Sequence, residues 1–136
     1  HFARELIFSA SIPPAAAAAV LAALEIIKAE PERRERLWAI THRVHKELKG
    51  LGFNIGATQT PIVPIYIGDD MQCFGVWKQL TEAGIFANAI IAPAVQPGHA
   101  LLRTSYTANH TDAQIDRVLE TFAAIGKEAG LIPAAV

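Results

Sequence analysis

The sequence predicts an α+β fold: a small, largely antiparallel three-stranded sheet covered by helices and preceded by a long N-terminal helical segment. Two observations favour this class. Apolar periodicity with Gly and Pro breaks marks out helices along the chain, whereas the β-branched and aromatic runs that indicate strands occur only from residue 61 onward. Strands that come late in a chain, with helices around them, are typical of helices layered on one sheet.

Length and charge restrict the classes of function. The 136 residues have room for one compact domain, 1–136. Lysine and arginine number 12 against 13 acidic residues, so the charge of -1 does not favour nucleic acid or an anionic membrane as a partner. No run approaches the ~18 apolar residues that span a bilayer, and no signal-peptide pattern opens the chain, which fits a cytoplasmic protein.

The start of the chain and its single cysteine carry further expectations. The chain begins with His1 and contains the alanine run Ala15–Ala19, which suits packing against another surface, so we expect a fragment of a larger polypeptide. Cys73 has no second cysteine to pair with and is expected to fill the core. No dinucleotide-binding, P-loop, zinc-binding or nucleophile-elbow motif occurs, and no metal site is predicted.

Two helices are predicted in the first 50 residues. Prolines in a first turn indicate a helix over residues 13–29, with Ser11 as its candidate N-cap. A second helix over residues 32–49 ends where Gly50 and Gly52 stop it. Its apolar stripe comprises Leu37, Ile40, Val44, Leu48 and Leu51.

The remaining predicted elements are a strand over 61–67, a helix over 71–83, strands over 86–91 and 101–107, and a helix from Thr111 to between 126 and 130. Prolines confine the first strand to an edge or an irregular position. In the helix that follows it, Phe74, Trp77 and Leu80 are spaced to face inward. The last two strands pair as a hairpin across a loop over 92–100, and Thr111 with Gln114 has capping-box spacing.

The last predicted strand carries the candidate binding residue, Arg103. Alternation sends Leu102, Thr104 and Tyr106 to one face, so Arg103 shares the other face with Leu101, Ser105 and Thr107. A guanidinium group is planar and permanently charged, and it can form two parallel hydrogen bonds with a carboxylate. The pattern therefore allows a carboxylate-binding arginine, and it also allows a solvated arginine on an edge strand.

Three segments, in this order, resemble the C-terminal small domain of the α-oxoamine synthases, a branch of the fold-type I pyridoxal-phosphate (PLP) enzymes. They are residues 7–15 (IFSASIPPA), 60–65 (TPIVPI) and 93–111, which runs from PAVQPG through LRTS to HT. The similarity covers nearly the whole chain. The family includes serine palmitoyltransferase, 8-amino-7-oxononanoate synthase, 2-amino-3-oxobutyrate CoA ligase and 5-aminolevulinate synthase.

The resemblance implies a homodimeric PLP enzyme that condenses an amino acid with an acyl-CoA, usually with loss of CO2. Arg103 matches the family's arginine that binds the carboxylate of the amino acid. Ser9 and, less directly, Ser11 match the segment that reaches the cofactor phosphate of the neighbouring subunit. For Ser11, helix capping is an equal alternative.

The resemblance also implies that the cofactor is anchored outside these residues. The family holds PLP on a lysine within a Ser/Thr-rich segment that this sequence lacks, so no catalytic residue is expected here and the fragment alone is expected to be inactive. Two other interpretations stay open: the equivalent domain of a class I/II aminotransferase, and a non-catalytic domain that binds a partner. The sequence does not specify the amino acid or the acyl-CoA.

Overall fold

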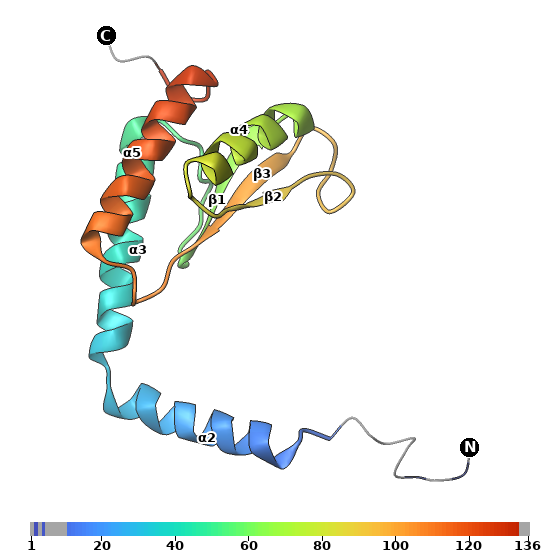
Figure 1. Ribbon diagram of the computed structural model, residues 1–136, viewed down its shortest axis with the longest axis vertical. Coiled ribbons are helices and arrows are strands. Elements are labelled where there is room, and N and C mark those ends of the chain that lie inside the picture. The colour runs from blue at the N-terminus through green and yellow to red at the C-terminus, as the bar shows by residue number, and fades with distance from the viewer. Residues whose placement is uncertain (1, 3, 5–10, 134–136) are drawn as a thin grey trace. The chain divides into compact units, whose positions relative to one another are not determined.

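The computed structural model describes residues 2, 4 and 11–133, and the chain divides into two compact units, His1–Arg34 and Glu35–Val136. Within the described residues, four helices and a three-stranded antiparallel sheet confirm the α+β prediction (Figure 1). In chain order the elements are α2 (Pro14–Ala29), α3 (Glu32–Leu51), β1 (Ile62–Gly68), α4 (Asp70–Glu82), β2 (Asn88–Ile90), β3 (Ala100–Ser105) and α5 (Asp112–Glu128).

β3 is the central strand of the sheet. The strand order is β1-β3-β2, and both pairings are antiparallel. This confirms the edge position of β1, which its prolines require, and the hairpin of β2 with β3. β2 and β3 are both shorter than predicted, because the chain turns away at Ile91, whose carbonyl accepts from the Ala94 N–H, and again at Thr107, whose carbonyl accepts from the His110 N–H.

The hydrophobic core lies between one face of the sheet and the helices of the second unit. Strand positions contribute Val63, Ile65 and Leu102, all with no exposed surface. The fully or nearly buried helical residues of this core are Ile40, Val44, Leu48, Cys73, Val76, Leu80, Ile115, Leu119, Phe122 and Ile125. The core position of Cys73 is confirmed. The stripe predicted for α3 is confirmed at Ile40, Val44 and Leu48, which are buried, while Leu37 and Leu51 at its ends are half-buried.

The predicted inward face of α4 is wrong at Phe74, whose surface is 43% exposed. The helix begins at Asp70, and Asp69 caps it by accepting a hydrogen bond from the Gln72 N–H at 2.8 Å. This start places Cys73, Val76 and Leu80 inward, one position out of phase with Phe74. Phe74 instead packs edge to face against Trp77, with ring centroids 6.0 Å apart.

Two predictions about helix ends are also corrected. Ser11 does not cap α2: the N-cap residue is Pro13, which makes no side-chain capping bond, and Ser11 lies two residues before it. Gly50 does not end α3, which continues to Leu51, but Gly52 follows the helix end as predicted and adopts the left-handed conformation at φ 99°. An exposed glycine such as Gly50 can be accommodated within a helix. The residue after a helix end often adopts a positive φ, which glycine adopts readily, so Gly52 suits that position.

Both predicted ends of α5 are confirmed. The side chain of Thr111 accepts from the Gln114 N–H, and the side chain of Gln114 accepts from the Thr111 N–H, so the capping box is complete. The helix ends at Glu128, and Gly130 follows at φ 67°.

Candidate functional site

Arg103 lies in the middle of the central strand, on the face of the sheet that points away from the core. Burial alternates along β3, with Ala100, Leu102 and Thr104 buried and Arg103 and Ser105 exposed, which confirms the predicted division of faces. Within the described residues, the Arg103 guanidinium takes part in no hydrogen bond or ion pair. Its five donors are therefore available to a ligand.

The outer face of the sheet, defined by Ile62, Pro64, Tyr66, Asn88, Ile90, Leu101, Arg103 and Ser105, is mostly apolar around this charge. Ile62 and Tyr66 are 49% and 41% exposed. Cross-strand pairing places Pro64 on one side of Arg103 and Asn88 on the other. These two neighbours could not be predicted, because strand register depends on loop geometry that alternation does not reveal.

The backbone that carries Arg103 is held from both sides. On the core side the Thr104 hydroxyl donates to the Val63 carbonyl at 3.0 Å, which fixes β3 against β1. Beyond the strand, the His110 ring nitrogen Nδ1 accepts from the Thr107 N–H at 3.1 Å. Arg36 of α3 then donates to the His110 carbonyl at 3.0 Å and to Asp112 at 2.8 Å. A strand held in this way can present one side chain in a defined direction.

The loop between β2 and β3 borders the same strands. It turns at Gly98, which has φ 79°, and the His99 N–H donates to the Gln96 carbonyl at 3.0 Å. Residues 92–97 line a shallow hollow of about 540 Å³.

The predicted phosphate contacts are only partly described. Ser9 lies outside the described residues. Ser11 is exposed and precedes α2, and it belongs to the first unit, whereas Arg103 belongs to the second. Because Ser11 does not cap α2, its hydroxyl makes no capping bond there.

The lysines do not fit an anchor for PLP. All five, Lys28, Lys46, Lys49, Lys78 and Lys127, are exposed and lie on helices. An amine is activated for Schiff-base chemistry by desolvation or by a neighbouring cation. Neither condition is met at an exposed helix surface, so none of these lysines has the environment of an activated amine.

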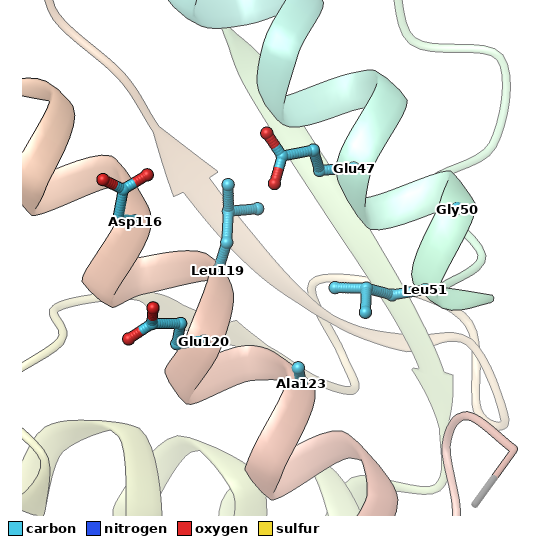
Figure 2. Close-up of a pocket in the computed structure, with 7 residues that line it drawn as sticks. All are labelled: Glu47, Gly50, Leu51, Asp116, Leu119, Glu120 and Ala123. Carbon is cyan, nitrogen blue, oxygen red and sulfur yellow. The ribbon is translucent and has the colours of Figure 1, made fainter. Parts of the chain in front are cut away.

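Figure 2 shows a groove between α3 and α5, with a volume of about 380 Å³. Its floor is apolar, formed by Leu51, Leu119 and Ala123, and acidic side chains stand at its rim. Two of these, Glu47 and Asp116, are paired with Arg43, whose pKa they raise through hydrogen bonds and charge. The ion pair of Arg43 with Asp116 links α3 to α5 beside the groove, and the groove does not include Arg103.

Two buried groups have shifted pKa values. Burial raises the pKa of the Tyr106 phenol. Burial and the charge of Asp70 raise the pKa of the Cys73 thiol, which keeps it protonated and unreactive. Both groups lie on the core side of the sheet, opposite the outer face.

Metal-binding clusters and membrane-spanning helices are both absent from the described residues. No group of three or more His, Cys, Asp or Glu is arranged to bind a metal ion. No helix there is long and apolar enough to cross a membrane.

Comparison with known proteins gives a family match and close relatives. The model for "Aminotransferase class I and II" matches residues 1–122. The 8-amino-7-oxononanoate synthase of Symbiobacterium thermophilum is 44% identical over 132 residues, which cover 97% of this chain and 34% of the relative. The serine palmitoyltransferase of Bacteroides ovatus is 48% identical over 120 residues, 88% of this chain and 30% of that protein. The chain thus spans about a third of the curated relatives it matches.

Solved structures agree with the sequence comparison. The serine palmitoyltransferase of S. paucimobilis, solved with bound PLP, superposes with a TM-score of 0.83 at 38% identity, over 92% of this chain and 32% of that one. The Sphingomonas wittichii serine palmitoyltransferase gives a TM-score of 0.84 at 32% identity, over 93% of this chain and 32% of that one. The 8-amino-7-oxononanoate synthase of Francisella tularensis, at 23% identity and a TM-score of 0.76, shares the fold.

Proposed function

Because the chain belongs to the aminotransferase class I and II family, we propose that it is the carboxylate-binding domain of a PLP-dependent acyltransferase. The complete enzyme condenses an amino acid with an acyl-CoA, usually with loss of CO2. The names of the relatives, 8-amino-7-oxononanoate synthase and serine palmitoyltransferase, support this class of reaction. The observation that carries the proposal is Arg103, an exposed cation with unused donors on a mostly apolar sheet face.

Arg103 binds the carboxylate of the amino acid through two parallel hydrogen bonds. Because the guanidinium projects from a central strand, the bound carboxylate has a defined position, and this fixes which Cα bond of the substrate faces the reacting centre. The apolar residues around Arg103 limit access of water once the rest of the enzyme covers the face, and the attraction between the two charges grows stronger. Bound PLP supplies the electron sink for bond cleavage at Cα.

The cofactor is held by residues outside these 136. The five exposed lysines of this chain leave the Schiff-base lysine to the part of the enzyme that the chain does not span. The chain is thus one domain of a larger enzyme and is inactive alone. The enzyme is a homodimer that acts in the cytoplasm, and Ser9 and Ser11 contact the cofactor phosphate of the neighbouring subunit.

The direct test is substitution of Arg103 in the full-length enzyme. Arg103→Ala removes the charge and Arg103→Lys keeps it without the planar fork. We expect Arg103→Ala to lower kcat/KM for the amino acid by the equivalent of about 2 to 4 kcal/mol, with a smaller loss for Arg103→Lys. The control is Lys78→Ala, which removes an exposed charge from α4. Substitution of an arginine that is merely solvated would leave kcat/KM almost unchanged, so unchanged kinetics would reject the assignment.

A second assay separates the acyltransferase from the aminotransferase alternative. Incubation of full-length enzyme with an amino acid and palmitoyl-CoA should release CoA, whereas an aminotransferase would form a keto acid from the amino acid without consuming acyl-CoA. The non-catalytic alternative predicts that the full gene encodes no lysine able to bind PLP. Reduction of the holoenzyme with borohydride, followed by peptide mapping, identifies that lysine or shows that there is none.

A further inference from the structure

The register of the sheet places an asparagine directly beside the arginine. Asn88 of β2 is the cross-strand partner of Arg103, and Pro64 of β1 is its partner on the other side. Residues directly opposite each other in an antiparallel pair point to the same face, with Cβ atoms roughly 4.5 to 5.5 Å apart. Pro64, Arg103 and Asn88 therefore form a row across the outer face, with the cation in the centre.

The two neighbours of Arg103 offer different chemistry. The ring of Pro64 offers hydrocarbon alone. Asn88 offers a carbonyl oxygen and an amide N–H, whereas a guanidinium has five donors and no acceptor. Asn88 is half-buried, and within residues 11–133 its side chain makes no hydrogen bond. The residue directly opposite Arg103 thus holds an acceptor that nothing else described in the structure uses.

Side-chain length decides which part of the arginine this acceptor meets. The asparagine side chain is much shorter than the arginine side chain. Its amide atoms are three bonds from Cα, whereas Nε of arginine is four bonds from Cα and the terminal nitrogens that would grip a carboxylate are six, so from a directly opposite backbone position Nε is the arginine nitrogen nearest in height. Asn88 therefore reaches the arginine and not the substrate.

Building on the proposed function, we propose that Asn88 is a positioning residue for Arg103. Its Oδ1 accepts a hydrogen bond from the Arg103 Nε–H when the carboxylate is bound, so that the remaining N–H groups point at the substrate. A long, exposed arginine loses rotamer freedom on binding, and a fixed acceptor next to its stem reduces that loss. The asparagine thereby raises the affinity of the site for the amino acid without touching it.

The test measures amino-acid affinity in the full-length holoenzyme. The absorbance of PLP is titrated with each of the twenty common amino acids, and the tightest ligand is used for all variants. We expect Asn88→Ala to raise the Kd about tenfold, the size of one hydrogen bond, while the melting temperature stays unchanged. The matched control is Asn109→Ala, which removes an exposed asparagine from the turn after β3.

A double variant separates positioning from a general structural role. Lysine has a methylene group where arginine has Nε–H, so in an Arg103→Lys background the substitution Asn88→Ala should add no further loss. Equal losses in both backgrounds, or no effect of Asn88→Ala on its own, would overturn the inference. Should Asn88→Ala fail to fold, Asn88→Val removes the amide while favouring a strand.

The failure of the proposed function would look different. If neither Arg103→Ala nor Arg103→Lys changes the Kd, or if no amino acid perturbs PLP, then the carboxylate site itself is wrong and Asn88 has nothing to position. If the Arg103 variants weaken binding but Asn88→Ala does not, the carboxylate site stands and only the role of Asn88 is rejected.

Discussion

At the scale of single residues, Arg103 and Tyr106 of the segment that begins with β3 have opposite environments. Arg103 is exposed, whereas Tyr106, just beyond the strand, is 7% exposed on the core side. Within the described residues, the Tyr106 hydroxyl is buried and has no hydrogen-bond partner. A buried donor without a partner costs about 1 to 3 kcal/mol. Tyr106 therefore contributes packing from its ring and a penalty from its hydroxyl.

We predict that Tyr106→Phe stabilises the protein by about 1 kcal/mol at neutral pH. Burial raises the pKa of the phenol, so the folded state holds its proton more tightly than the unfolded state. The stability due to this difference is complete below the unfolded pKa of about 10 and is lost as pH rises through the folded pKa. Urea unfolding at several alkaline pH values should show that the free energy of unfolding falls less with rising pH in Tyr106→Phe than in the unaltered protein. A destabilised variant would mean that the hydroxyl has a partner.

Alternation along a strand could assign Arg103 to its face because side chains point to opposite sides with a period of two, whatever the strand pairs with. Asn88 could not be assigned, because its place beside Arg103 depends on the register across a proline-containing loop. The sequence predicts Ser11 as the N-cap of α2, whereas the N-cap in the structure is Pro13. Serine and proline near a helix start are common at several positions, so their types predict the helix but not its first residue.

At the scale of elements, two helical glycines differ in how closely other atoms pack against them. Gly126 in α5 lies against Phe53, and a Cβ built there would be 2.4 Å from the Phe53 ring. Gly75 in α4 has no other atom within 4 Å of the same position. The first glycine is therefore required for close approach, whereas the second carries only the entropic cost of glycine in a helix.

We predict that Gly75→Ala stabilises the protein by about 0.5 to 1 kcal/mol and that Gly126→Ala destabilises it by about 1 to 3 kcal/mol. Thermal unfolding of the two variants side by side measures both effects. A smaller side chain in the variant Phe53→Leu should recover part of the stability lost in Gly126→Ala. If the two alanines had equal effects, the contact between Gly126 and Phe53 would not restrict packing.

Element types and order follow from periodicity, but the phase of α4 does not. The spacing of Phe74, Trp77 and Leu80 fits a helical stripe as well as the observed Cys73, Val76 and Leu80 do. Large aromatic side chains favour the first stripe. The structure follows the second because Asp69 caps the helix and the small Cys73 fits beneath the sheet with no exposed surface. The fit of side-chain volumes in a close-packed core therefore decides which face of α4 is buried, and the hydrophobicity of the residues does not.

At the scale of the whole molecule, the chain leaves two apolar surfaces uncovered. None of the residues of α2 is buried, and Val20, Leu21, Leu24, Ile26 and Ile27 are all at least 43% exposed. The outer face of the sheet exposes Ile62 and Tyr66 around Arg103. Exposed apolar patches of this kind mark surfaces that bind something else. The relatives are about three times as long, so the remainder of a full-length enzyme is the partner we expect for both surfaces.

This expectation predicts a difference in proteolysis between the isolated chain and the full-length enzyme. Thermolysin cleaves before large apolar residues in accessible backbone, so it should cut within α2 of the isolated chain and leave a resistant product that contains residues 35–133. Mass spectrometry of the products locates the cuts. In the full-length enzyme the same bonds should resist, because the rest of the protein covers α2. Equal cleavage in both proteins would show that α2 stays exposed, and a role for this helix in joining the domains would then be rejected.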